Sequence, residues 1–472
     1  MIASTNNKYF INSINYGFCL EFLLLIISQS LLHLLYYINI SVSGSLSCIV
    51  LFLQIFYYFI NKPIFALKYL TLFFAIITNI VGVYLNENYY IYLYEIGVYS
   101  TNYNCLLPLV CVYTVLLFIL EVIDFICTKR LCLPMVCRKN IYNKRLIKFV
   151  VYIGLLSSFF LFINIYNKPF FLLGVDRIGY NNDVLGGLSF VNKLIWFIPF
   201  CAYAIQLKIY RKISYLCLTM ILLCAFWSGQ KFGFYFLSLY LYLLVYVTSH
   251  MTILNHNLKY ARQTLVYIIC AFLLIFGILY MFRTVSNASG LFDEYLFQRA
   301  AQQGQVWSQV YGNCRHTHIS EFSYEVSSAV HNKLDPKTND NFGIYKMMWF
   351  ITQNSKLINS KIISGSRFSC STQASLYYYF GYNVMFFIMI IFTLIYSFFI
   401  NSYINAILKK HFIDIILYIT LYYQLNELFW MSGFYALISK KTILCLFALV
   451  FINLIRHIKL NNSTIKTGDN HV

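Results

Sequence analysis

The feature that most constrains this chain is the recurrence of long apolar runs between short basic loops. A helix that spans a bilayer needs about 20 mostly apolar residues, and the sequence holds about twelve such runs. We expect spans at 17–38, 45–61, 64–85, 105–127, 147–166, 189–207, 213–229, 232–249, 264–282, 377–400, 412–430 and 441–456. Only 11% of the residues are charged, against about 25% in a soluble domain. The sequence therefore predicts an all-α polytopic membrane protein.

The net charge of +19 lies largely in the loops between these runs. Basic loops mark the cytoplasmic face of a membrane protein, so we interpret them as orientation signals rather than as a nucleic-acid surface. The loop after the fourth run contains Lys129, Arg130, Arg138, Lys139, Lys144, Arg145 and Lys148. With both termini in the cytoplasm, the basic loops share one side, Lys440 and Lys441 excepted.

The chain then divides into three parts: spans over 1–282, an external segment over 283–376, and spans with a short cytoplasmic tail over 377–472. The external segment is mostly polar but carries many aromatic residues, so we expect it to fold rather than stay disordered. Its stretch LFDEYLFQRAAQQGQVWSQVY predicts one helix, with acidic residues in the first turn.

Within that helix, the spacing of Arg299, Gln302 and Gln303 puts all three on one face. A guanidinium binds phosphate through two donors, and amides suit sugar hydroxyls because they donate and accept together. Gly304 would let a substrate approach the backbone closely. This face is therefore a candidate binding site for a phosphate and a glycan. The alternative is an ordinary solvated helix face.

The next segment, GNCRHTHISEFSYEVSS, contains Arg315, His318 and Glu321. Arginine suits an anion, and histidine or glutamate can accept a proton. His316 and His318 form a pair of potential metal ligands, but no third ligand with suitable spacing follows, and no paired-acid Asp-x-Asp signature occurs. We therefore expect neither a metal nor another cofactor.

Four further cations are expected on the external side: Arg177, Lys231, Arg283 and Arg367. Arg367 follows Gly365 and Ser366 just before an expected helix, where free N–H groups also attract phosphate. For Lys231 the alternative is a side chain that extends along the membrane boundary. For Arg177 it is an ion pair with Asp176.

The stretches SGQKFGFYF, RAAQQGQVW and SGSRFSCSTQASLYYYFG, on such a bundle with one large external segment, resemble the O-antigen polymerases of Gram-negative bacteria. These are Wzy-type oligosaccharide repeat-unit polymerases, which are similar to C-type membrane glycosyltransferases. The chain departs from that family near RFSCSTQASL, where a turn that contains proline is often found.

The resemblance implies a fold, a reaction and a place. The enzyme would lie in the bacterial inner membrane and act on its periplasmic face. It would move a growing glycan from one undecaprenyl diphosphate onto a repeat unit carried by another, without a metal. The external arginines would bind the diphosphates, Glu321 or His318 would accept the proton, and a chain-length regulator would be a partner.

Three alternatives stay open on the sequence. An O-antigen ligase has similar topology and a lipid A acceptor. A lipid-linked oligosaccharide flippase also has about twelve helices, but transporters of this kind usually carry internal repeats and short loops. The third alternative is a structural or sensory membrane protein without catalysis. The external cluster of Arg, Gln and His argues against it, because such a protein would not need one.

Overall fold

The computed structural model describes residues 21, 23–38, 40–93, 95–131, 144–170, 180, 184, 186–206, 208, 210–230, 232–251, 292–330, 343–352, 354, 356–359, 372–409, 411–431 and 439–468. Helices dominate this part of the chain, and the all-α class expected from the sequence is confirmed. The exception is a short antiparallel hairpin of β1 (Tyr92–Leu93) and β2 (Val98–Tyr99). Gly97 closes it with a φ of +71°, which a residue without a Cβ adopts readily.

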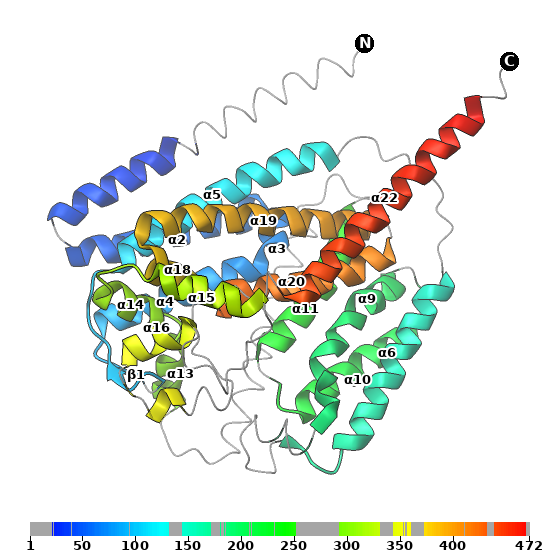
Figure 1. Ribbon diagram of the computed structural model, residues 1–472, viewed down its shortest axis with the longest axis horizontal. Coiled ribbons are helices and arrows are strands. Elements are labelled where there is room, and N and C mark those ends of the chain that lie inside the picture. The colour runs from blue at the N-terminus through cyan, green and yellow to red at the C-terminus, as the bar shows by residue number, and fades with distance from the viewer. Residues whose placement is uncertain are drawn as a thin grey trace.

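The helices form a bundle with a smaller group of helices packed at one of its ends (Figure 1). The bundle contains the stretch Leu23–Ile38, α2 (Ile40–Asn61), α3 (Pro63–Lys68), α4 (Leu70–Asn88), α5 (Leu106–Leu131), α6 (Lys144–Ile165), η1 (Gly186–Phe197), α9 (Ile198–Gln206), α10 (Arg211–Trp227), α11 (Phe232–Met251), α19 (Tyr382–Lys409), α20 (Phe412–Met431) and α22 (Lys440–Gly468). The smaller group, which we call the cap, contains α13 (Phe292–Ala301), α14 (Gln305–Asn313), α15 (Ile319–Val330), α16 (Gly343–Thr352) and α18 (Thr372–Phe380).

Five helices in the described part are long and apolar enough to cross a membrane. They cover Ser43–Asn61, Leu70–Asn88, Leu106–Cys127, Arg145–Ile165 and Tyr382–Lys409. Shorter apolar helices cover Leu23–Ile38, Lys193–Gln206 and Gly233–Tyr246. The chain is thus a multi-pass membrane protein. The full number of spans stays a prediction, because the expected run 264–282 lies outside the described residues.

Three expected spans differ from the helices observed. The run 64–85 is divided at Tyr69 into α3 and α4. The run 377–400 is interrupted at Gly381, whose φ of +76° separates α18 from α19, so the long helix begins at Tyr382. The run 189–207 begins as the 3-10 helix η1 and becomes α-helical only at Ile198. Hydropathy reports the apolar length of a segment, whereas these breaks depend on local backbone geometry.

Contacts between helices fix the direction in which the chain crosses the bundle. The Trp227 indole nitrogen donates to the Tyr166 carbonyl over 3.0 Å, so α6 and α10 end side by side. The Lys148 ammonium lies 5.0 Å from the Tyr210 ring centre, so they also begin together. These two helices are therefore parallel, and η1 with α9 carries the chain back between them.

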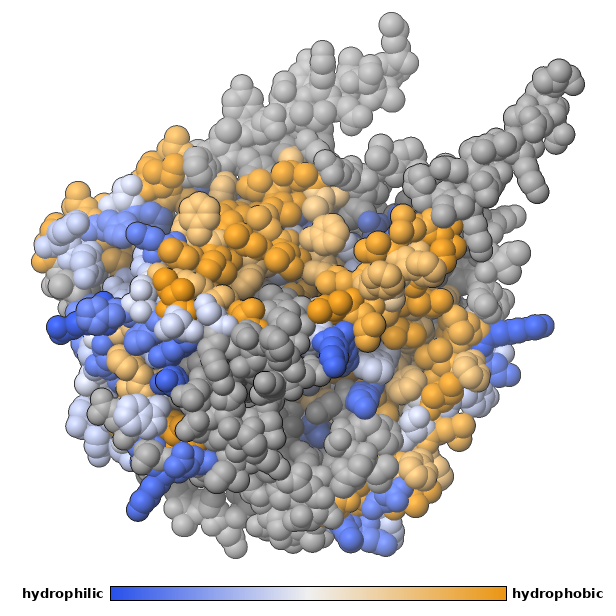
Figure 2. All heavy atoms as spheres, viewed as in Figure 1, coloured by the Kyte–Doolittle hydropathy of each residue, from blue (hydrophilic) through white to orange (hydrophobic). Residues whose placement is uncertain are grey.

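Apolar side chains cover the outside of the bundle, as a bilayer requires. On α19 the exposed residues are Val384, Phe387, Ile391, Leu394 and Phe398, which recur at helical spacing. Figure 2 shows hydrophobic side chains gathered over the part of the surface formed by α5, α19 and α22, and hydrophilic ones around the cap. The exposed apolar surface identifies a lipid bilayer as the environment of this bundle.

A buried ionic network lies inside the bundle at the end opposite the cap. The Lys68 ammonium is 2.9 Å from the Asp124 carboxylate, and both side chains are largely buried. The Tyr69 hydroxyl donates to Asp124 over 3.1 Å and accepts from the Asn401 amide over 3.0 Å. Because an unpaired charge is costly away from water, these hydrogen bonds tie α3, α5 and α19 together.

The cap packs directly on the bundle. α13 contacts α4 and β1, and α14 lies against α4, α16 and α18. α15 packs on α16 and α18, and α18 continues into α19 after Gly381. The polar segment expected to lie outside the bundle therefore forms helices where α4 ends and α5 begins.

Candidate site at the capped end of the bundle

Arg299 lies in the last turn of α13, and its side chain is 52% exposed. Its guanidinium donates to the side-chain oxygen of Gln302 over 2.9 Å and lies 3.8 Å from one Glu95 carboxylate oxygen. The other Glu95 oxygen accepts from the Gln305 amide over 2.7 Å. A cation at a helix C-terminus also interacts favourably with the helix dipole. Arg299 is thus oriented from two sides while part of it faces solvent.

The single helix expected over RAAQQGQVW is wrong, because the chain turns between α13 and α14 at 302–304. A Cβ added at Gly304 would lie 2.1 Å from the Val83 backbone nitrogen, and one at Gly82 would lie 2.3 Å from the Gly304 nitrogen. The Asn86 amide also donates to the Ala301 carbonyl over 3.0 Å. The space beside Gly304 is therefore filled by α4, and the glycine permits packing rather than the approach of a substrate.

Most amides of this stretch point into the protein. Gln302 is 6% exposed and Gln305 is 0% exposed. Trp307 is fully buried and donates from its indole nitrogen to the Cys105 carbonyl over 3.0 Å. Arg299 and Gln302 lie on one side of the chain, as their spacing predicts, but Gln302 accepts a hydrogen bond from the guanidinium instead of facing solvent. Gln303 lies in the turn and is half-buried. Glycan binding by these two glutamines stays a prediction.

A second polar cluster joins α15 to α18. The Tyr378 hydroxyl donates to one Glu321 oxygen over 2.8 Å, and the other Glu321 oxygen lies 3.4 Å from His318 Nδ1. The His318 ring stacks on Tyr378 with centres 4.2 Å apart. Burial raises the pKa of Tyr378, and the hydrogen bond to Glu321 and its charge raise it further. Tyr378 therefore stays a neutral donor at physiological pH, and its hydroxyl and His318 hold the Glu321 side chain between them.

The other predicted site residues belong to neither cluster. Arg315 is exposed in the link between α14 and α15, three residues before His318. Arg177, Lys231, Arg283 and Arg367 lie outside the described residues. Among the residues that the structure describes, no group of His, Cys, Asp and Glu is arranged to hold a metal ion.

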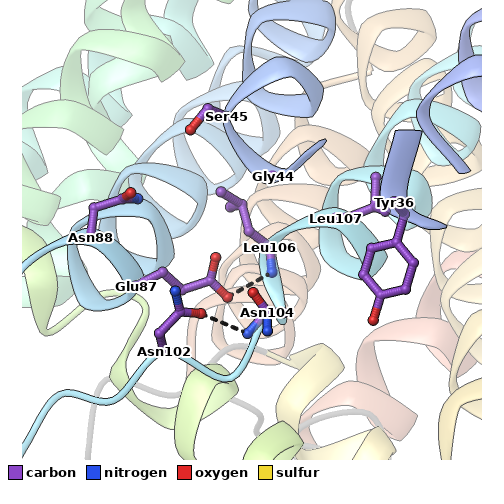
Figure 3. A pocket seen from close by; sticks show the side chains of 9 residues that line it. All are labelled: Tyr36, Gly44, Ser45, Glu87, Asn88, Asn102, Asn104, Leu106 and Leu107. Carbon is purple, nitrogen blue, oxygen red and sulfur yellow. Dashed lines mark hydrogen bonds between the residues drawn. The ribbon is translucent and has the colours of Figure 1, made fainter. Parts of the chain in front are cut away.

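A cavity between α2, α4 and the start of α5 was not predicted from the sequence. It is a small hollow that is partly open to solvent. Its lining consists of Tyr36, Gly44, Ser45, Glu87, Asn88, Asn102, Asn104, Leu106 and Leu107 (Figure 3).

One oxygen of Glu87, which lines this cavity, accepts hydrogen bonds from the start of α5. Oε1 accepts from the backbone nitrogen of Cys105 and, over 3.1 Å, from that of Leu106. These are donors at the beginning of α5 that have no carbonyl partner within the helix. Figure 3 shows the Glu87 carboxylate turned toward Leu106 among the asparagines of the rim.

Sequence reasoning missed three residues of this end: Glu87, Glu95 and Tyr378. The two acids belong to NENYYIYLYEIGVYSTN, a loop without Lys or Arg, and acids on the same face as external arginines are their natural partners. The sequence therefore contained a signal for these two acids. Tyr378 lies in an aromatic run and carries no comparable signal.

Residues 337–446 match a protein family described as a family of unknown function, DUF6418. The matched stretch runs through α16, α18, α19 and α20 into α22. No curated protein and no solved structure matches the chain.

Proposed function

We propose that this chain is a metal-independent glycosyltransferase that polymerises undecaprenyl-diphosphate-linked oligosaccharide repeat units into O-antigen or capsular polysaccharide. The resemblance in three sequence stretches supplies the reaction. The observation that carries the proposal is the cap, which sets an exposed guanidinium, Arg299, and a carboxylate with two ring partners, Glu321, at one end of a membrane bundle. A lipid carrier would present its diphosphate at that boundary.

The proposed reaction needs little beyond charge stabilisation and positioning. An acceptor hydroxyl attacks the anomeric carbon of the donor glycan, and the bond from that carbon to the diphosphate oxygen breaks. The electron pair stays with the diphosphate, where Arg299 and Arg315 would stabilise the charge. The acceptor proton would pass to Glu321, which Tyr378 and His318 hold in place.

The proposal also includes the number of spans and their orientation in the membrane, which the described helices do not determine. About twelve spans of about 20 residues each, both termini in the cytoplasm and the cap in the periplasm would place the site next to lipid-linked substrates of the bacterial inner membrane. An arrangement like that of C-type membrane glycosyltransferases follows from the same resemblance.

Deleting the gene in its host tests the reaction class. A polymerase defect leaves lipid A core with a single repeat unit, because ligation continues, and restoring the gene restores the ladder on a gel of surface polysaccharide. Loss of every repeat unit contradicts polymerisation and identifies a ligase or a flippase. An unchanged ladder contradicts all three functions.

A further inference from the structure

An exposed stripe runs along α6 from a cationic first turn to an apolar remainder. Arg145 and Lys148 are exposed, and their spacing puts them on one face of the helix. The exposed residues that continue this face are Phe149, Tyr152, Leu156, Phe160 and Ile163. Each of these five lies three or four positions beyond the one before it. In a bilayer, such a stripe presents charge to lipid headgroups and apolar surface to acyl chains.

The Lys148 ammonium lies against two tyrosine rings. It is 5.7 Å from the ring centre of Tyr152 on its own helix and 5.0 Å from that of Tyr210, in the link between α9 and α10. A cation is attracted to the face of an aromatic ring, and an ammonium in this position still has N–H donors for an anion. The two rings therefore position Lys148 where α6 meets α10.

The link that brings the Tyr210 ring to Lys148 has an unfavourable backbone conformation. Lys208 and Tyr210 have φ values of +55° and +50°, in the left-handed region that residues with a Cβ rarely adopt. Tyr210 also precedes α10 without capping it through a side-chain hydrogen bond. Strain of this kind is found where a functional contact requires it, and the contact that Tyr210 makes is with Lys148.

This junction is strongly positive. Lys208 is exposed and lies two residues before Tyr210, so it is a third cation near the two rings. The described residues of α6, η1, α9, α10 and α11 contain no Asp or Glu. At the start of α20, Asp414 is bound by Arg456 over 2.9 Å. An anion at the junction would therefore offset positive charge that the described residues of these helices do not offset.

The junction lies at the end of the bundle opposite the cap. α19 begins beside the cap and ends at Lys409. The Tyr203 hydroxyl of α9 donates to the Ile407 carbonyl near that end, so the link that follows α9 is there too. Figure 1 shows α6 and α10 side by side and away from the cap.

We propose that the start of α6 and the α9–α10 link bind the headgroup of an anionic phospholipid. Its phosphate would lie among Arg145, Lys148 and Lys208, and an acyl chain would follow the apolar stripe of α6. A soluble phosphate would use the cations and leave that stripe without a ligand. The site is separate from the proposed reaction at the cap, and its binding can be measured without turnover.

Tyr210→Gly distinguishes this site from a general positive surface, because it removes a ring and no charge. Glycine adopts a φ of +50° readily, so the variant should unfold at the wild-type temperature or above it. A second variant, Arg145→Gln with Lys148→Gln, removes two cations of the site. Lys168→Gln with Lys409→Gln is the matched control, since it removes two exposed cations that follow α6 and end α19.

The test is native mass spectrometry of the full chain in detergent. Phosphatidylglycerol is the anionic probe, phosphatidylcholine the zwitterionic one and glycerol 3-phosphate the soluble one. We expect the wild type and the control to bind phosphatidylglycerol about tenfold more tightly than the other two probes. The Arg145→Gln and Lys148→Gln double variant should bind it about tenfold more weakly or worse, because each basic residue contributes about fivefold near anionic lipid. Tyr210→Gly should bind it about threefold more weakly.

Four outcomes overturn the inference. Equal binding of the two lipids would mean that no headgroup is selected. Glycerol 3-phosphate that binds as tightly as phosphatidylglycerol would identify a soluble anion. An equal loss in the control would mean that overall charge attracts the lipid. Unchanged binding by Tyr210→Gly would mean that the ring does not position Lys148.

Discussion

The Arg299 guanidinium lies 3.8 Å from the Glu95 carboxylate, a residue in the turn of the β-hairpin. Glu95 also accepts from Gln305 at the start of α14, so one acid joins the hairpin to both helices around the turn. An ion pair with a half-exposed arginine is worth about 0–1 kcal/mol. A phosphate that offers two acceptor oxygens can therefore draw Arg299 away from Glu95 at little cost.

Arg299→Ala should shorten or abolish the polysaccharide ladder. A hydrogen bond to a charged group is worth about 1.5–3 kcal/mol, and its loss in the transition state slows a reaction by roughly ten- to a hundredfold or more. Arg299→Lys should also impair activity, because lysine keeps the charge but lacks the two-pronged donor. Arg211→Ala, at the opposite end of the bundle, is the control. Normal ladders from a well-expressed Arg299→Ala variant would return this position to a solvated helix face.

Gly304→Ala should destabilise the protein. Its methyl group would meet the Val83 backbone nitrogen at 2.1 Å, and backbone cannot rotate aside as a side chain can. Forced overpacking costs about 1–3 kcal/mol, and here α14 must move away from α4. Thermal unfolding in detergent should show a lower midpoint than for Gly233→Ala, whose methyl group meets no atom of the described residues within 4 Å. Equal midpoints would mean that α4 and α14 do not cross this closely.

The fold follows from the sequence as far as local patterns determine it. Apolar runs such as 45–61 and 105–127 became α2 and α5, since burial and internal hydrogen bonds act within the segment. The turn at 302–304 could not be predicted in this way. Its cause is the crossing at Gly82, more than two hundred residues earlier in the chain.

The candidate site was likewise predictable only where its contacts join residues that are close in the sequence. The spacing of Arg299 and Gln302 predicted that they share one face, and in the structure they lie close enough to form a hydrogen bond. Their burial and the partner Glu95 required the tertiary structure. The pairing of Glu321 with His318 is likewise local, whereas its bond to Tyr378 spans two separate helices.

Tyr378→Phe should make stability less dependent on pH in the alkaline range. Burial and the Glu321 carboxylate raise the pKa of the phenol above its unfolded value of about 10. The contribution of the neutral phenol is fully present below that unfolded pKa. It is lost as the pH rises above it, because only the unfolded chain ionises readily. Removing the hydroxyl also costs about 0.5–1.5 kcal/mol at neutral pH. Unfolding midpoints measured from pH 8 to 11 check both effects, and parallel curves for the two proteins would contradict this environment for Tyr378.

Reporter fusions should place the cap and the segment 132–143 on opposite sides of the membrane. This segment follows α5, which begins beneath the cap and runs to the other end of the bundle. The Lys68–Asp124 pair marks that other end within the bundle. A phosphatase reporter, active only outside the cytoplasm, should be silent after Lys139 and active near Lys337. A fluorescent protein that folds only in the cytoplasm should give the reverse pattern. The same signal at both positions would mean that the span between α11 and α13 is absent, and the diphosphate would then have to reach Arg299 from the cytoplasm.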